Sequence, residues 1–256
     1  MFKLITFSVF ILALLPALAN RDNSQPPKLL NGVHRVVTLG DSITQGGEGP
    51  GGYVWLVRHY LKVLYPQQGI EVSNAGISGH KSTDMLKRFQ KDVLDKKPDL
   101  VTISVGVNDV WHGFYDNHPL GDGPRGVNLD DYRKNVEAMI TLAQATGAKV
   151  IVLSTTVIHE DPKTPENIKL FDYNRALRDL ARAHHCGFVD FQKPFKALIN
   201  AYRSTTGSRD NLLTSDGVHM NALGNKVMAA TILGGMGISP EAREAVRKEV
   251  EAEMKK

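Results

Sequence analysis

The chain has 256 residues, of which 42% are hydrophobic and 23% charged, and its formal net charge is +4. This composition is typical of a globular protein with a full-sized core and excludes a largely disordered chain. The small basic excess does not by itself indicate a nucleic-acid partner. The single cysteine, Cys186, excludes an intrachain disulfide and a zinc site built from several cysteines.

The N-terminal segment has the pattern of a secretory signal peptide. Lys3 precedes an apolar run over residues 4–15, and the small-residue pattern A-L-A follows at residues 17–19. The run is shorter than the roughly 20 apolar residues that a membrane-spanning helix needs. We therefore expect a signal peptide at residues 1–19, cleaved after Ala19, and a secreted or periplasmic protein without an integral membrane segment. A polar, proline-bearing leader at residues 20–32 is expected to be disordered.

Short apolar runs then alternate with segments of helical periodicity. Strands are expected at residues 35–39, 70–73, 100–105, 150–153 and 188–191, and helices at 53–65, 82–94, 129–145, 167–184, 221–233 and from 240 onward. Apolar strands separated by helices predict a parallel sheet that is covered on both faces. The sequence therefore predicts an α/β protein, with a single three-layer α/β/α domain over residues 33–256.

Residues with hydrolytic chemistry follow the expected strands. Ligands bind beyond the carboxyl ends of parallel strands, so the segments after these strands are expected to meet at one edge of the sheet. Ser42 lies in the first strand-to-helix turn, and Asp216 and His219 lie in a loop before a late helix. A three-residue separation lets Asp216 reach one ring nitrogen of His219 and leaves the other for Ser42. A serine activated in this way is a nucleophile.

Hydrogen-bond donors for a developing oxyanion are expected at the same edge. The backbone N–H of Gly76 is unobstructed by a side chain, and Asn108 offers a side-chain amide at the end of a central strand. The backbone N–H of Ser42 is a third candidate. As structural alternatives, Gly76 would serve backbone shape alone and Asn108 a left-handed turn. Asp41 and Asp109 are interpreted as structural turn residues first and as functional residues second.

Four sequence blocks resemble those of the SGNH or GDSL-type hydrolases. They are G-D-S-I-T at residues 40–44, N-A-G-I-S-G at 74–79, G-V-N-D at 106–109 and D-G-V-H at 216–219. Their order and spacing also fit the family, and the resemblance spans about residues 33–235. It implies a five-stranded parallel sheet in a flavodoxin-like strand order, and an enzyme that needs neither a metal nor an organic cofactor.

The resemblance also implies a role for each matched residue. Ser42 would be the nucleophile, His219 the general base and Asp216 the acid that orients the base. Gly76 and Asn108, with the Ser42 amide, would form the oxyanion hole. The resemblance thus predicts a carboxylic ester hydrolase that works through an acyl-serine intermediate.

The four blocks do not specify a substrate, but the long segment after the third block favours one class. The segment from Trp111 to Val127 is long and carries several aromatic residues, an arrangement that suits stacking on a sugar ring. Asp41, Trp111 and His112 are the candidate substrate contacts. We expect hydrolysis of short acyl esters, acetyl above all, on a small molecule or polysaccharide. A lysophospholipase or thioesterase acting on lipids, and a catalytically silent extracellular glycan-binding protein, remain as alternatives.

Two further sequence patterns would indicate functions other than hydrolysis. Gly47–Gly52 matches the dinucleotide-binding pattern G-x-G-x-x-G, but seven residues separate it from the preceding strand. His112, Asp116 and His118 could in principle hold a metal, but their spacing in a loop is not a known ligand signature. We therefore expect no metal site.

Overall fold

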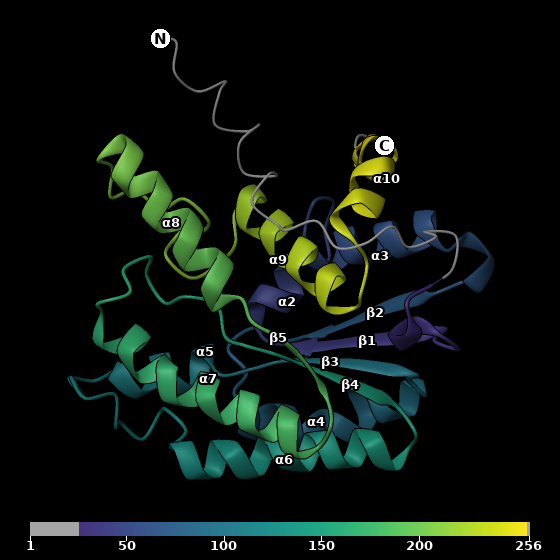
Figure 1. Ribbon diagram of the computed structural model, residues 1–256. Helices are drawn as coiled ribbons and strands as arrows, with labels where there is room; N and C mark the ends of the chain where they lie inside the picture. Colours follow the sequence, from purple (N-terminus) through teal and green to yellow (C-terminus); the bar gives the residue numbers. More distant parts are fainter. Residues whose placement is uncertain (1–25, 255–256) are drawn as a thin grey trace.

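The computed structural model describes residues 26–254 and arranges them around a five-stranded parallel sheet (Figure 1). The strand order is β2-β1-β3-β4-β5, which confirms the flavodoxin-like order expected from the resemblance. The strands are β1 (Arg35–Gly40), β2 (Glu71–Gly76), β3 (Leu100–Ser104), β4 (Lys149–Leu153) and β5 (Gly187–Val189).

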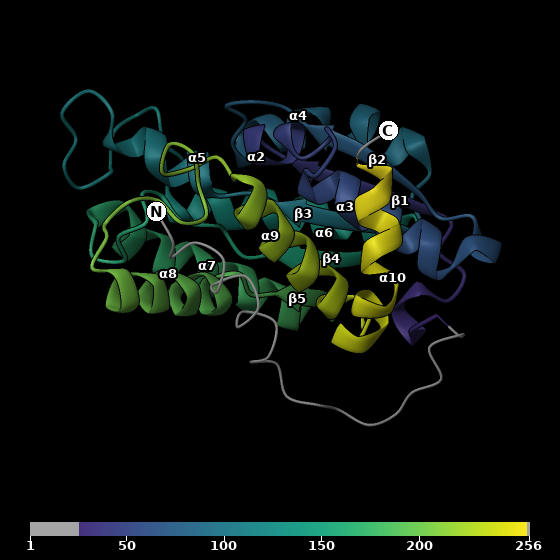
Figure 2. The ribbon, with the colours of Figure 1, turned by 90° about the horizontal axis from the view of Figure 1, so that it is seen from above.

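Helices cover both faces of the sheet. In Figures 1 and 2, α3, α9 and α10 lie on one face, and α4, α6 and α7 lie on the other. Within the described residues, no helix combines the length and the apolar character needed to cross a membrane. The helices are α2 (Ser42–Gly46), α3 (Tyr53–Leu64), α4 (Ser82–Asp92), α5 (Val107–Trp111), α6 (Leu129–Ala145), α7 (Pro165–Ala183), α8 (Gln192–Thr206), α9 (Ala222–Gly235) and α10 (Pro240–Glu253).

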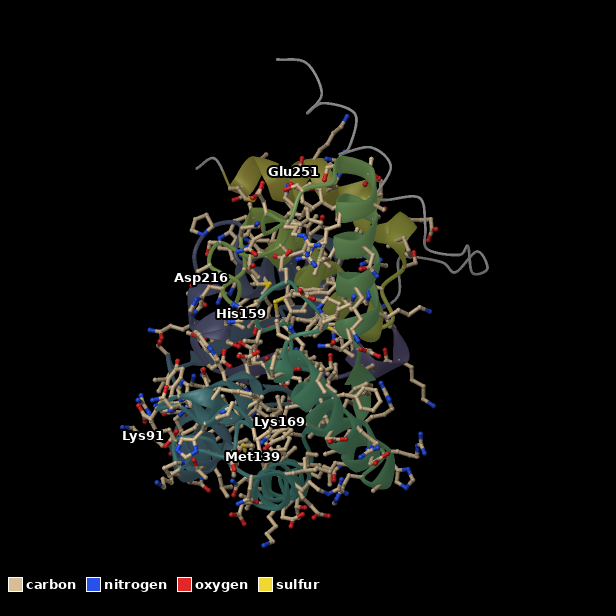
Figure 3. All side chains as sticks on the ribbon, turned by 90° about the vertical axis from the view of Figure 1, so that its left-hand side faces the viewer. Lys91, Met139, His159, Lys169, Asp216 and Glu251 are labelled. Atoms are coloured by element: carbon tan, nitrogen blue, oxygen red, sulfur yellow. The ribbon has the colours of Figure 1, made fainter. Side chains whose placement is uncertain are left out.

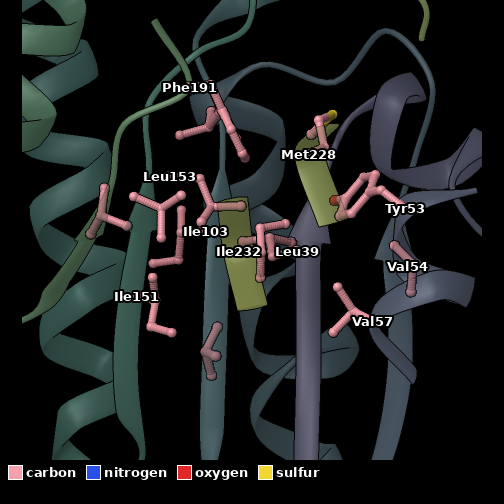
Figure 4. Packing of buried hydrophobic residues seen from close by; sticks show 14 of the residues in the cluster. Leu39, Tyr53, Val54, Val57, Ile103, Ile151, Leu153, Phe191, Met228 and Ile232 are labelled. Carbon is pink, nitrogen blue, oxygen red and sulfur yellow. The ribbon is translucent and has the colours of Figure 1, made fainter. Parts of the chain in front are cut away.

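The core lies between the sheet and these helices. The central strands are rich in valine, isoleucine and leucine, which pack well on a pleated surface, and most of their residues are buried. In Figure 4, Leu39 and Ile103 of the sheet pack against Tyr53 of α3 and Ile232 of α9. This packing fixes the strand ends, and therefore the segments that leave them, in one rigid frame.

The predicted strands and long helices are confirmed, with ends displaced by a few residues. Three α-helices within residues 26–254 have no predicted counterpart: α2, α5 and α8. The first two have five residues each, too few for a periodic pattern. In α8, Pro194 falls in the first turn, where proline is tolerated, and the buried Phe195 and Ile199 have helical spacing.

The described fold begins ahead of the expected domain boundary at residue 33. Lys28–Leu30 form a 3₁₀ helix, and the Leu30 side chain is fully buried in the core. The Lys149 ammonium group donates to two carbonyls of this segment, at 2.8 and 2.7 Å. The expected disorder therefore does not extend to residues 28–32, because an apolar side chain there joins the core. The expected signal peptide and the start of the leader lie outside the described residues.

Candidate active site

Ser42, His219 and Asp216 form one chain of hydrogen bonds. Ser42 begins α2, directly after β1, and its Oγ lies 2.9 Å from Nε2 of His219, which is 177 positions away in the sequence. Nδ1 of His219 lies 2.6 Å from Oδ2 of Asp216. The structure thus brings together the three residues that the sequence predicted, in the order hydroxyl, imidazole and carboxylate.

The loop between Asp216 and His219 is folded around the aspartate. Oδ1 of Asp216 accepts the backbone N–H groups of Val218 at 2.9 Å and of His219 at 2.8 Å. Gly217 takes a φ of +95°, a left-handed conformation that glycine adopts without steric cost. Partial burial alone would raise the pKa of Asp216. Hydrogen bonds from the His219 ring and from these two amides outweigh burial and lower that pKa to about 2.

Asp41 sits beneath the first turn of α2. Its side chain is only 3% exposed, and its Oδ1 accepts the Ile43 N–H at 2.9 Å, which makes it the N-cap of the helix. Burial raises the pKa of Asp41 to about 6, against the opposing effects of the Ile43 amide and the His219 ring. Asp41, a candidate substrate contact, thus has its carboxyl enclosed beneath α2. The Ser42 N–H donates to no other described residue.

Asn108 lies at the start of α5, beyond the end of β3, and is only 4% exposed. Its Nδ2 donates to the carbonyl of His80 at 3.1 Å. An amide group has two N–H donors, and the second is used by no described residue. Asn108 thus offers a fixed side-chain donor at the same edge of the sheet as Ser42.

Gly76 is placed differently from the expectation. Its N–H donates to Oδ1 of Asn74 at 2.7 Å and is therefore already engaged. A Cβ atom at this position would lie 2.2 Å from the backbone nitrogen of Gln45 in α2. The absence of a side chain at Gly76 is thus explained by the close approach of α2 to β2.

Gly79, three positions later in the same sequence block, has the properties expected of Gly76. It is exposed, has a φ of +75°, and its N–H donates to no described residue. The next residue, His80, provides the carbonyl that Asn108 binds, so the segment lies beside that side chain. Sequence reasoning missed Gly79, although the second glycine of N-A-G-I-S-G was a visible signal.

Asp109 is buried immediately behind Asn108. Its side chain is 1% exposed, and its two oxygens lie 2.9 and 3.2 Å from the Ser82 N–H. Burial raises the pKa of Asp109 to about 7. The hydrogen bonds from Ser82 oppose this shift, and the nearby carboxyl of Asp41 adds to it. Asp109 is a structural residue that joins α5 to α4, as the first interpretation of the sequence proposed.

We expect the Asp109→Asn variant to gain stability over the wild type as the pH rises. The folded chain holds the Asp109 proton more tightly than the unfolded chain does. Raising the pH from about 4 to about 7 therefore lowers the free energy of unfolding of the wild type. In the variant, residue 109 does not titrate and adds no such pH dependence. Each pKa unit corresponds to about 1.4 kcal/mol, so the relative gain reaches a few kcal/mol. Urea unfolding at about pH 5 and pH 8 measures it. The prediction would be contradicted if the variant and the wild type differed in free energy of unfolding by the same amount at both pH values. Asp130→Asn, which changes an exposed carboxyl, is the control.

An aromatic cluster borders the site. It consists of Trp111, His112, Tyr115 and His159. The ring of Trp111 lies 5.8 Å from Tyr115 and 6.4 Å edge-on from His159, and His112 stacks on Tyr115 at 5.0 Å. Burial, together with the positive charges of Lys81 and Arg125, lowers the pKa of His112. Trp111 and His112, both expected at the substrate rim, are partly exposed beside Asn108.

The other two sequence patterns have ordinary structural roles. Gly47–Gly52 forms a hydrogen-bonded turn between α2 and α3, whereas a dinucleotide fingerprint follows a strand directly. His118 faces Asp122, with 3.4 Å between Nδ1 and Oδ1. Within residues 26–254, no three His, Cys, Asp or Glu side chains are grouped in a way that could hold a metal ion.

The chain is similar to several esterases. A model of the GDSL-like lipase/acylhydrolase family matches residues 38–227. An acetylxylan esterase from Geobacillus stearothermophilus is 29% identical over 214 residues, which cover 79% of this chain and 94% of that protein. The uncharacterized lipoprotein YqeF from Bacillus subtilis is 26% identical over 231 residues, with coverages of 80% and 90%. The crystal structure of the acetyl xylan esterase AlAXEase matches with a TM-score of 0.70 and 33% identity, and covers 78% of this chain and 98% of its own.

Solved structures of the Geobacillus stearothermophilus esterase include three catalytic mutants. They replace an aspartate, a histidine and a serine by alanine, and match this chain with TM-scores of 0.69, 0.70 and 0.69. In that protein the aspartate precedes the histidine by three positions. Asp216 and His219 have the same spacing here.

Proposed function

Because the chain belongs to the GDSL-like lipase/acylhydrolase family and is a carboxylic ester hydrolase, we propose that it removes acetyl or other short acyl groups from a carbohydrate. The observation that carries this proposal is the hydrogen-bonded chain from Asp216 through His219 to Ser42. It joins a hydroxyl, a ring nitrogen that can take its proton, and a carboxylate that holds the ring in one orientation.

The proposed reaction has two halves. In the first, Oγ of Ser42 attacks the ester carbonyl carbon while Nε2 of His219 takes the hydroxyl proton. The bond to the alcohol then breaks, and His219 returns the proton to the leaving oxygen. In the second, His219 takes a proton from water as the water oxygen attacks the acyl carbon. The bond from that carbon to Oγ of Ser42 then breaks, and His219 returns the proton to Oγ, which releases the acid and restores the free serine. The low pKa of Asp216 keeps its carboxylate charged while the imidazolium forms.

Three donors are proposed for the oxyanion hole. The Ser42 N–H and the second Nδ2 hydrogen of Asn108 are both free of described partners. The third donor is assigned to Gly79 in place of Gly76, because the Gly76 N–H is bound to Asn74. Donors that are fixed before the reaction stabilise the developing negative charge without having to reorganise.

A carbohydrate substrate is supported by the surroundings of the site. The partly exposed rings of the aromatic cluster offer flat surfaces for a sugar ring. The similar protein from Geobacillus stearothermophilus and AlAXEase are both named as acetylxylan esterases.

The substrate proposal predicts a preference for short acyl chains. We expect kcat/KM for 4-nitrophenyl acetate to exceed that for the octanoate by at least about tenfold, because a site adapted to an acetyl group on a sugar does not bury a long acyl chain. Acetylated xylan should release acetate, and lysophosphatidylcholine should not be hydrolysed. Absorbance of the released 4-nitrophenol, an acetate assay and chromatography of the lysolipid measure these three outcomes. Ser42→Ala is the blank. Faster turnover of the octanoate, or cleavage of the lysolipid, would favour a lipid substrate.

The proposed localisation is outside the cytoplasm. It rests on the signal-peptide pattern at residues 1–19 and is supported by the likeness to a lipoprotein. A polymeric carbohydrate substrate would be encountered in that compartment.

A further inference from the structure

The segment that carries Asp216 and His219 has little regular structure of its own. It joins α8 to α9 and contains one isolated bridge, between Thr214 and Met220. Asn221, the N-cap of α9, donates to the carbonyls of Leu212 and Thr214 at 2.9 and 3.3 Å. These contacts are all local. They shape the loop but do not place it against Ser42.

Glu160 supplies a long-range attachment. It lies in the connection between β4 and α7, is 2% exposed, and its carboxyl oxygens accept four hydrogen bonds. The donors are the N–H groups of Leu212 at 2.8 Å, Leu213 at 2.7 Å and Thr214 at 2.7 Å, and the Thr214 hydroxyl at 2.7 Å. Within residues 26–254, Glu160 and Ser42 are the only distant residues whose side chains bond to segment 208–219.

These bonds restrict the loop strongly. A buried carboxyl is costly unless it is fully hydrogen-bonded, and here three consecutive residues of the loop satisfy it. A shift of the loop would leave the carboxyl and several amides without partners at once. Because Thr214 is only two positions before Asp216, the attachment also limits where the Asp216 carboxylate can lie.

The residue next to Glu160 contacts the other end of the same turn. His159 has a φ of +54°, and its Nδ1 would lie 2.9 Å from a Cβ atom at Gly217. In Figure 3, His159 and Asp216 lie near each other on the side of the molecule that faces the viewer. Asn167 holds the backbone there, accepting the Ile158 N–H at 3.1 Å and donating to the His159 carbonyl at 3.0 Å. The loop is therefore contacted both before and after Asp216.

We propose that Glu160 is a positioning residue for the Asp216–His219 pair. It acts through the backbone of residues 212–214 and never touches the substrate. The inference rests on the proposed function, in which that pair activates Ser42. In this arrangement the connection after β4, which supplies no reacting group, sets the distance between the base and the nucleophile.

The test compares Glu160→Ala and Glu160→Gln. Glu160→Ala removes all four bonds. We expect kcat for 4-nitrophenyl acetate to fall by about 10²-fold, the effect of a displacement near 1 Å at a reacting group, while KM stays within about twofold. Glu160→Gln keeps an oxygen for Leu213 and Thr214 but faces the Leu212 N–H with another donor, so its loss should be smaller. Formate, which supplies a carboxylate to the vacated space, should partly restore the activity of Glu160→Ala.

A spectroscopic measurement separates positioning from mere stabilisation. The proton between His219 and Asp216 should give a far-downfield proton resonance, identified by its absence in Asp216→Asn. It should persist in the wild type and weaken or move in Glu160→Ala at temperatures well below the unfolding transition. This readout does not need ester hydrolysis, so it decides the inference even if the wild type proves inactive, which would refute only the proposed function.

Other variants provide the controls for Glu160→Ala. Glu166→Ala removes a carboxyl from the start of α7 that does not bond to the loop, and should leave kcat unchanged. If Glu160→Ala does not fold, Glu160→Gln and Thr214→Val, which deletes one of the four bonds, must still show reduced kcat. Unchanged kcat per folded molecule and an unchanged resonance in these variants would overturn the inference, even if their melting temperatures fell.

Discussion

The Ser42→Ala variant is expected to lose about 10⁴- to 10⁶-fold in kcat on short acyl esters, because no other group can form the acyl-enzyme. The remaining rate would come from the oxyanion donors and from substrate binding alone. The His219 ring loses its 2.9 Å contact with the hydroxyl, but its loop keeps the four hydrogen bonds to Glu160. Circular dichroism and the melting temperature should therefore stay close to those of the wild type.

The measurement pairs turnover of 4-nitrophenyl acetate with labelling by a serine-directed phosphonofluoridate. The wild type should gain one adduct at Ser42 in the intact mass, and the variant none. Ser204→Ala, which changes an exposed serine of α8, is the matched control and should keep full activity. Equal turnover by Ser42→Ala and the wild type would contradict the proposed chemistry and favour the glycan-binding alternative.

The Asp216→Asn variant is expected to lose about 10⁴-fold in kcat. Its Oδ1 can still accept the N–H groups of Val218 and His219, so the turn should remain folded. Its Nδ2, however, would be a donor facing Nδ1 of His219. This favours the tautomer that carries its proton on Nε2, the nitrogen that must accept the proton of Ser42. The charge that stabilises the imidazolium is also removed.

The pH dependence sharpens this prediction. Because the pKa of Asp216 is lowered to about 2, its carboxylate is charged at every pH at which the enzyme would be assayed. The loss in Asp216→Asn should therefore be similar from about pH 5 to pH 9. Rate profiles of both proteins measure it, with Asp210→Asn, an exposed change in the same loop, as the control. A variant that matched the wild type at any pH in this range would contradict the assigned role.

Much of the fold could be predicted because its signals are local. Buried parallel strands read as continuous apolar runs, and long helices show a repeating apolar face. The pairing of Asp216 with His219 was predictable from their three-residue spacing, and their meeting with Ser42 from the resemblance of the four sequence blocks to one family. The five-residue helices α2 and α5 were not predicted, because segments this short show no repeating apolar face.

The details of the site depended on information that the sequence does not display locally. Gly76 and Gly79 share one block, and only the backbone path shows which N–H is free and which is bound to Asn74. Asp41 resembles an exposed turn residue, but packing of α2 buries it. Glu160 resembles a surface glutamate in a loop, and its partners lie 52 to 54 positions away.

The 177-residue separation between Ser42 and His219 has a consequence for how the enzyme regains activity after denaturation. An intermediate with a formed sheet but an undocked segment from α8 onward would possess most of the native secondary structure and still hydrolyse nothing. Contacts between such remote segments are completed late, because closing long stretches of chain is entropically expensive. Recovered turnover during refolding should consequently lag behind the far-ultraviolet signal and mark the final docking event.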